Sequence, residues 1–129
     1  MATTTPPTSN QFTPLAQHQF VVLTTYRRDG TPVPTTVWFA NAGAVVYITT
    51  RQESGKLKRV RRDGRVLLTP ADRMGTLLGE PAMAGNAREV TDDERAHALA
   101  ALATKYGAQW TQAVGAGEDD PARAYIVVE

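Results

Sequence analysis

The feature that most constrains the fold is a series of short β-like segments separated by turns between residues 20 and 50. Segments 20–26 and 44–50 are rich in β-branched and aromatic residues and follow a two-residue period, as half-buried strands do. Asp29-Gly30 supplies the left-handed backbone conformation that a tight hairpin requires. A chain that reverses direction this often is expected to build an antiparallel sheet.

The segment between these two, 32–40, is predicted to be a strand as well. Pro32 and Pro34 weaken its first half and indicate an edge position or a bulge there. Asn41-Ala42-Gly43 then provides the next turn. Later strands are expected at 65–69, within 76–90 as one or two strands, and at 123–129.

The clearest predicted helix covers 91–106, because Thr91 and Glu94 form a capping box and Gly107 can end the helix. Two shorter helices are also expected. They cover 13–19, with Thr13 as the N-cap and Pro14 in the first helical position, and 54–62, with Ser54 as the N-cap. Six or seven antiparallel strands with two or three helices imply a mainly β fold, a small β-barrel closed by the final strand.

A chain of 129 residues is most simply one domain, here 13–129, after a Thr/Pro/Ser-rich tail at 1–12. Residues 108–122 are expected to form a loop, whose acidic run at 118–120 would be solvated. No apolar run is long enough for a transmembrane helix, and no signal-peptide pattern begins the chain. A cytoplasmic protein with no membrane partner is therefore expected.

The composition excludes several kinds of chemistry. The chain has no cysteine, so thiolate catalysis and cysteine-bound metals are excluded, and its two histidines, His18 and His97, make a histidine metal site improbable. No G-x-S-x-G motif and no local Ser/His/acid set is present. The catalytic residues cannot be named, and any chemistry is expected to come from a cofactor.

The segment 46–66 carries the strongest sign of a binding site. It begins as a strand, passes through a polar turn and becomes a helix whose start holds Ser54 and Lys56. A helix N-terminus attracts anions, whereas a lysine in the first turn opposes the helix dipole by a few tenths of a kcal/mol. The pattern therefore favours a phosphate-binding site. Seven residues of the segment are cationic: Arg51, Lys56, Lys58, Arg59, Arg61, Arg62 and Arg65.

Two other interpretations of these cations stay open. They could form a solvated basic face with Leu57 and Val60 packed inward. They could also bind nucleic acid, but such binding needs aromatic partners, and only Tyr47 lies nearby. The formal net charge of +1, from 14 basic and 13 acidic residues, also disfavours a nucleic-acid partner.

The second predicted strand offers a surface for a planar ring. In 35–39, threonine hydroxyls and apolar side chains precede an aromatic pair, so that backbone groups could meet a ring edge. The alternative is that Val37 and Phe39 face the core while Trp38 covers a dimer contact. The two interpretations are compatible.

Two motifs resemble the flavin/deazaflavin split β-barrel family. They are D-G-x-P-x-x-T-x-V-W-F, from Asp29, and S-G-K-x-K-R-x-R-R, from Ser54. The resemblance covers about 12–129. Within this family, the chain is most similar to the pyridoxamine-phosphate-oxidase-like enzymes of actinobacteria that use the deazaflavin coenzyme F-420.

The resemblance implies a homodimer of FMN-binding split barrels, with cofactor sites at the dimer interface. It also implies the cofactor contacts. The phosphate would be held by Ser54 and Lys56 with help from Arg51 and Lys58, and the ring would lie against Thr35, Thr36 and Val37 and near Thr49 and Thr50. The positive charge of 56–62 suits the lactyl-glutamate tail of F-420 better than compact FMN.

The sequence departs from true pyridoxamine phosphate oxidases, since it is shorter and lacks their C-terminal Arg/His substrate segment. Oxidation of pyridoxamine phosphate is therefore not expected. The resemblance implies instead an F-420-dependent oxidoreductase that transfers hydride to a small organic acceptor, with protons from solvent or a tyrosine. The alternatives are an FMN-dependent oxidoreductase of the same fold, or a non-catalytic carrier of a flavin, haem or similar ligand.

Overall fold

A computed structural model of the chain describes residues 11–114 and 122–129. Seven strands and three α-helices follow one short 3-10 helix, η1, in these residues. The elements in chain order are η1 (Thr13–Gln17), β1 (Phe20–Tyr26), β2 (Pro32–Val37), β3 (Phe39–Ala42), β4 (Val45–Arg51), α1 (Gly55–Arg62), β5 (Arg65–Ala71), β6 (Met83–Glu89), α2 (Asp92–Tyr106), α3 (Ala108–Val114) and β7 (Arg123–Val128).

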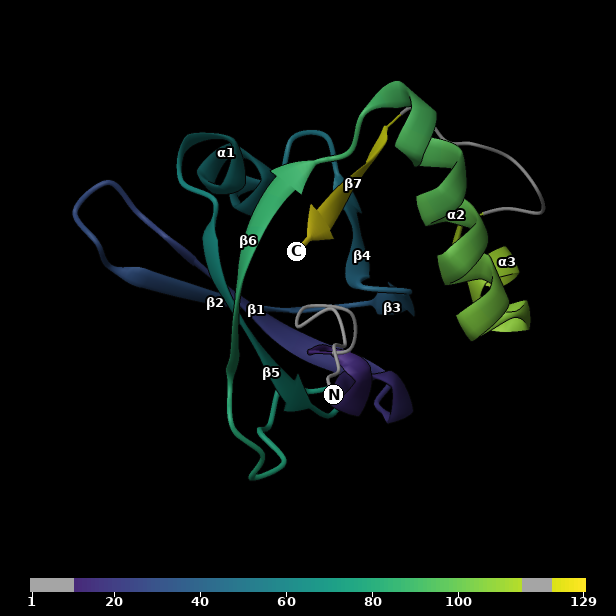
Figure 1. Ribbon diagram of the computed structural model, residues 1–129, viewed down its shortest axis with the longest axis horizontal. Coiled ribbons are helices and arrows are strands. Elements are labelled where there is room, and N and C mark those ends of the chain that lie inside the picture. Colours follow the sequence, from purple (N-terminus) through teal and green to yellow (C-terminus); the bar gives the residue numbers. More distant parts are fainter. Residues whose placement is uncertain (1–10, 115–121) are drawn as a thin grey trace, which may run out of the picture.

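The strands form one antiparallel sheet in the order β2-β1-β5-β6-β7-β4-β3. The last strand, β7, pairs with both β6 and β4 and so joins the two halves of the sheet. The two edge strands, β2 and β3, follow each other in the chain with only Trp38 between them. The sheet therefore curls so that its two edge strands, β2 and β3, come together where Trp38 joins them, as expected for a split β-barrel (Figure 1).

Strand β7 shows how the sheet separates two apolar layers. Its residues Ala124, Ile126 and Val128 belong to the cluster that fills the barrel. The alternate residues, Tyr125 and Val127, belong to a second cluster outside the barrel. Both sets are buried because successive side chains of a strand point to opposite faces and here both faces are covered.

Helices α2 and α3 cover the outer face of the sheet, and α1 lies on the opposite side of the molecule (Figure 1). Leu102, Tyr106 and Trp110 of α2 and α3 are buried against this face. On the other side, Leu57 and Val60 of α1 are buried in the barrel cluster. No helix in the described residues is both long and apolar enough to span a bilayer.

Several local predictions are confirmed. Ser54 caps α1, and Thr91 and Glu94 form the predicted capping box of α2, which ends at Gly107. The Asp29-Gly30 turn joins β1 to β2, with Gly30 at a φ of 89°. The prolines lie in β2, which is an edge strand as predicted.

The predicted strand at 32–40 is wrong in one respect, because it is broken at Trp38 into β2 and β3. Tyr106 explains where the break falls. The Phe39 backbone N–H donates to the Tyr106 hydroxyl at 3.0 Å, and this hydroxyl lies 2.6 Å from the Gln19 carbonyl that accepts from it. The buried Tyr106 hydroxyl therefore provides the hydrogen bonds to the backbone that a neighbouring strand would otherwise provide.

Other predictions need correction at the ends of elements. Thr13 is the first residue of η1 and not its N-cap, since no side chain caps that helix. The segment 76–90, predicted to hold one or two strands, contains one, β6, besides an isolated bridge between Ala71 and Leu77. The predicted loop 108–122 begins with a helix, α3, which is held by burial of Trp110. Of the predicted tail at 1–12, residues 1–10 lie outside the described residues, as does the acidic run at 118–120, but Phe12 is buried in the barrel cluster and is not part of a tail.

Lys105, near the end of α2, has a buried amine that lowers the stability of the fold. Its Nζ lies 3.4 Å from the centre of the Phe39 ring and has no hydrogen-bond partner among the described residues. Burial lowers the pKa of Lys105 to about 8. The charged amine is therefore less stable in the folded protein than in the unfolded chain.

We expect Tyr106→Phe to lower the free energy of unfolding by about 1–3 kcal/mol, because it leaves the Phe39 N–H buried without an acceptor. Urea unfolding measures this loss. Tyr26→Phe is the matched control, since the Tyr26 hydroxyl makes no hydrogen bond within the described part of the chain and its removal should change stability by less than about 0.5 kcal/mol. Equal effects of the two variants would contradict the role given to Tyr106.

We expect Lys105→Met to be more stable than the wild type at pH 7 and to lose this advantage as the pH rises from 8 to 10.5. The folded-state pKa of about 8 lies below the ordinary value of 10.5, so the wild type gains stability through that window by losing a proton that the unfolded chain keeps. Unfolding measured at several pH values tests this, with Lys58→Met controlling for the loss of one charge. A stability difference that does not change with pH would contradict it.

Candidate functional site

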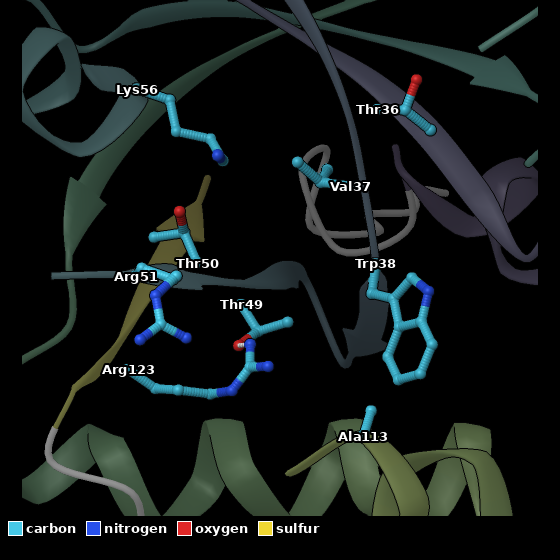
Figure 2. A pocket seen from close by; sticks show the side chains of 9 residues that line it. All are labelled: Thr36, Val37, Trp38, Thr49, Thr50, Arg51, Lys56, Ala113 and Arg123. Carbon is cyan, nitrogen blue, oxygen red and sulfur yellow. Dashed lines mark hydrogen bonds between the residues drawn. The ribbon is translucent and has the colours of Figure 1, made fainter. Parts of the chain in front are cut away.

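The candidate site is a cavity of about 260 Å³ between β2, β4, α1, α3 and the start of β7. Strands β2 and β4 approach each other here without pairing. Figure 2 shows the side chains around the cavity. The lining residues are Thr36, Val37, Trp38, Thr49, Thr50, Arg51, Lys56, Ala113 and Arg123.

The lining is divided by chemical character. Lys56, Arg51 and Arg123 lie on one side, and Val37 and Trp38 lie on the other (Figure 2). No aspartate or glutamate lines the cavity among the described residues. The site therefore offers cations at one end and an apolar wall at the other.

Two of the cations come from paired strands. Arg51 of β4 and Arg123 of β7 are direct partners in the antiparallel register. Like charges placed directly opposite each other destabilise a sheet. An anion held between the two arginines would relieve this repulsion.

Arg123 is also incompletely satisfied. One of its terminal nitrogens donates to the Thr49 hydroxyl at 3.2 Å, which fixes the direction of the side chain. Its Nε is buried and has no hydrogen-bond partner within the residues that the structure describes. A buried hydrogen-bond donor without a partner destabilises the fold, so an acceptor bound at the Arg123 Nε would be stabilising.

Lys56 reaches the cavity from the first turn of α1 (Figure 2). Burial lowers its pKa, and the neighbouring Arg59 charge lowers it further. No carboxylate pairs with Lys56 among the described residues. A phosphate beside Lys56 would stabilise its charged form and raise this pKa again.

The apolar wall depends on Trp38. Its ring stacks on Tyr106, with centroids 4.3 Å apart and an angle of 15° between the planes, and it lies 6.2 Å from the Trp110 ring. Because α2 and α3 hold both of these partners, Trp38 is fixed against the cavity. Trp38 remains half-buried.

The Ser54 side chain makes its hydrogen bonds within the turn between β4 and α1. Its hydroxyl oxygen accepts from the Leu57 N–H at 3.3 Å and from the Thr50 hydroxyl at 2.9 Å. These two bonds connect the end of β4 to the start of α1. Ser54 thereby sets the position of Lys56 and does not itself line the cavity.

The other arginines of α1 are engaged elsewhere. Arg59 donates to the Thr25 hydroxyl at 2.6 Å, Arg61 pairs with Glu89 at 2.7 Å, and Arg62 donates to the Tyr26 carbonyl. Lys58 is exposed and lies outside the cavity. The positive charge along 56–62 is thus distributed over several faces of the helix.

The cavity brings together most of the residues that the sequence singled out, namely Thr36, Val37, Thr49, Thr50, Arg51 and Lys56. Thr35, Ser54 and Lys58 lie outside its lining. Sequence reasoning missed Ala113 and Arg123, and it placed Trp38 either in the ring-lining strand or at a dimer contact. Arg123 carries no local signal, because only the pairing of β7 with β4 brings it to Arg51.

The residues present fit a planar ring that carries a phosphate. The unpaired cations and the free Arg123 Nε suit phosphate oxygens, which accept several charge-assisted hydrogen bonds. Val37 and Trp38 supply an apolar surface for a ring. The lining contributed by the described part of the chain contains no carboxylate or histidine.

Comparison with known proteins agrees with this description. The pyridoxamine 5'-phosphate oxidase family matches residues 8–129, which is nearly the whole chain. No curated protein matches the chain.

Solved structures with the same fold come from several bacteria. A candidate pyridoxamine 5'-phosphate oxidase from Listeria innocua has a TM-score of 0.65 at 22% identity, over 92% of this chain and 88% of that one. General Stress Protein 26 from Bacillus anthracis has a TM-score of 0.64 at 20% identity, over 92% and 84%. A heme binding protein from Mycobacterium smegmatis has a TM-score of 0.68 at 17% identity, over 98% of this chain but 52% of that one.

At these sequence identities the solved structures establish the fold alone. The family membership is established by the match to the family model. The seven-stranded split barrel and the match over residues 8–129 together show that the chain belongs to the pyridoxamine 5'-phosphate oxidase family.

Proposed function

We propose that the cavity binds the phosphate and ring of a flavin-type cofactor, FMN or the deazaflavin F-420, and that the chain is an oxidoreductase. The observation that carries this proposal is the convergence of Arg51, Lys56 and Arg123 opposite Val37 and Trp38, with no carboxylate among the described lining residues. The split-barrel fold is consistent with a flavin-binding oxidoreductase or a ligand carrier.

Each part of the cavity has a distinct task. Lys56 and the arginine pair bind the phosphate, and the Thr49 hydroxyl holds Arg123 in place for it. Trp38 and Val37 orient the ring and exclude water from one of its faces. When bound, the cofactor supplies hydride transfer, which the side chains of the cavity cannot perform. Because no acid lines the cavity within residues 11–114 and 122–129, we assign the proton to solvent.

The choice between the two cofactors turns on the extended tail of F-420. The charge on 56–62 is the sequence argument for this tail, but Arg59, Arg61 and Arg62 have partners on other faces of α1. The cavity cations alone provide for one phosphate. A direct comparison of the affinities of FMN and F-420 decides between them.

The proposal includes a homodimer. Met74, Leu77 and Leu78, in the segment between β5 and β6, are 83%, 57% and 47% exposed. Burial of these side chains against a second copy would stabilise the pair. The cavity of about 260 Å³ is also smaller than the roughly 300–1,000 Å³ of most complete ligand sites, as expected for a site that a second copy completes.

The proposal is tested by titrating the purified protein with FMN and with F-420 while following cofactor fluorescence. We expect one of them to bind at micromolar concentration, and Lys56→Gln to weaken that binding about 10-fold or more, because a charge-assisted hydrogen bond to phosphate is lost.

The matched control is Lys58→Gln, which removes the same charge from an exposed position on the same helix. We expect it to change the affinity by less than about twofold, since exposed charges are largely screened by salt. Failure of both cofactors to bind, or an equal effect of the two substitutions, would overturn the proposed site.

A second candidate function is a non-catalytic carrier. It is favoured by the lack of a carboxylate or histidine among the described lining residues and by the fold shared with a heme binding protein. Stopped-flow mixing of the reduced, cofactor-loaded protein with a quinone distinguishes the two. An oxidoreductase shows saturation with quinone concentration and exceeds the rate of free reduced cofactor, whereas a carrier does neither.

A further inference from the structure

A second cavity adjoins the first across Trp38 and Ala113, which line both. It has a volume of about 320 Å³, and its other lining residues are Arg73, Gln109 and Gln112. Trp38 thus forms a wall shared by two cavities. A molecule in the second cavity would lie next to a ring held in the first.

Arg73 is presented by a loop that is already ordered. The Asp72 carboxylate accepts from the Met74 and Thr76 backbone N–H groups, both at 2.9 Å, and the Asp72 N–H donates to the Thr76 carbonyl at 3.0 Å. These bonds close the loop around Arg73. They also occupy the neighbouring carboxylate, which makes no ion pair with Arg73.

The loop is held tightly against β2. Gly75 has a φ of +86°, and a Cβ atom at this position would lie only 2.6 Å from the Thr36 hydroxyl oxygen. Only glycine permits so close an approach with this backbone conformation. Because Thr36 also lines the first cavity, the loop fixes Arg73 relative to both cavities.

The second cavity is rich in hydrogen-bond donors. Arg73 has no carboxylate partner in the described ranges 11–114 and 122–129, and no acid lines the cavity there. Gln109 and Gln112 are three residues apart on α3, so their amides lie on one face of the helix. A guanidinium beside two amides is suited to a group with two anionic oxygens.

We propose that this second cavity is the subsite for the electron acceptor, and that the acceptor is a planar organic molecule bearing a carboxylate or sulfonate. This inference rests on the proposed function of the first cavity. Arg73 and the two amides bind the anionic group, while Trp38 borders the planar part. A hydride passes from the reduced cofactor to the acceptor and a proton comes from solvent, so that the acceptor gains two electrons and the cofactor is oxidised.

The test compares naphthoquinone with naphthoquinone sulfonate as acceptors for the reduced, cofactor-loaded protein in the stopped flow. We expect Arg73→Gln to lower kcat/KM for the sulfonate about 10-fold and to change that for the neutral quinone less than about twofold. Cofactor affinity should stay unchanged, because Arg73 does not line the first cavity. Arg28→Gln, in the exposed turn between β1 and β2, controls for the loss of one positive charge.

Binding of naphthoquinone sulfonate to the cofactor-free protein, followed by calorimetry, separates failure of this inference from failure of the proposed function. If neither cofactor binds but Arg73→Gln still weakens sulfonate binding, the proposed function fails and the anion subsite stands. If the cofactor binds but Arg73→Gln affects both quinones equally or neither, or if Arg28→Gln has the same effect, the subsite is overturned. Wild-type protein that does not bind the sulfonate overturns it as well.

Discussion

The buried hydroxyl of Tyr106 connects the residue before β1 to the first residue of β3, through the Gln19 carbonyl and the Phe39 N–H. This hydroxyl accepts a hydrogen bond from the Phe39 N–H at the point where the chain passes from one edge strand, β2, to the other, β3. The Tyr106 ring also stacks on Trp38. The long helix α2 therefore determines both where the edge strand breaks and where the indole lies. The two cavities depend on this arrangement, since Trp38 forms a wall of each.

Electrostatics support the proposal that the first cavity is a binding site and not a packing defect. The fold places Arg51 opposite Arg123, leaves a buried Arg123 nitrogen unpaired and lowers the pKa of Lys56 by burial. Each of these features is unfavourable in the isolated chain. A bound phosphate offsets all three, so the affinity for an anion and the local instability have the same physical origin.

Features encoded by neighbouring residues could be predicted from the sequence. The capping box at Thr91, the Asp29-Gly30 hairpin and the Ser54 cap depend on contacts within a few residues. Arg123 and the strand break at Trp38 depend on partners far along the chain, β4 for the first and Tyr106 for the second. The basic helix predicts an anion site, and that prediction stays untested, whereas Arg59, Arg61 and Arg62 make contacts elsewhere that the sequence does not reveal.

The central claim is that one cavity holds the phosphate and the ring of a flavin-type cofactor. A crystal structure of the protein with whichever of FMN or F-420 binds more tightly tests it most directly. We expect a phosphate oxygen about 3 Å from the Lys56 Nζ and from at least one of Arg51 and Arg123, with the ring beside Trp38. A phosphate bound on the outer face of α1 at Arg61, or a ring remote from Trp38, would contradict the account.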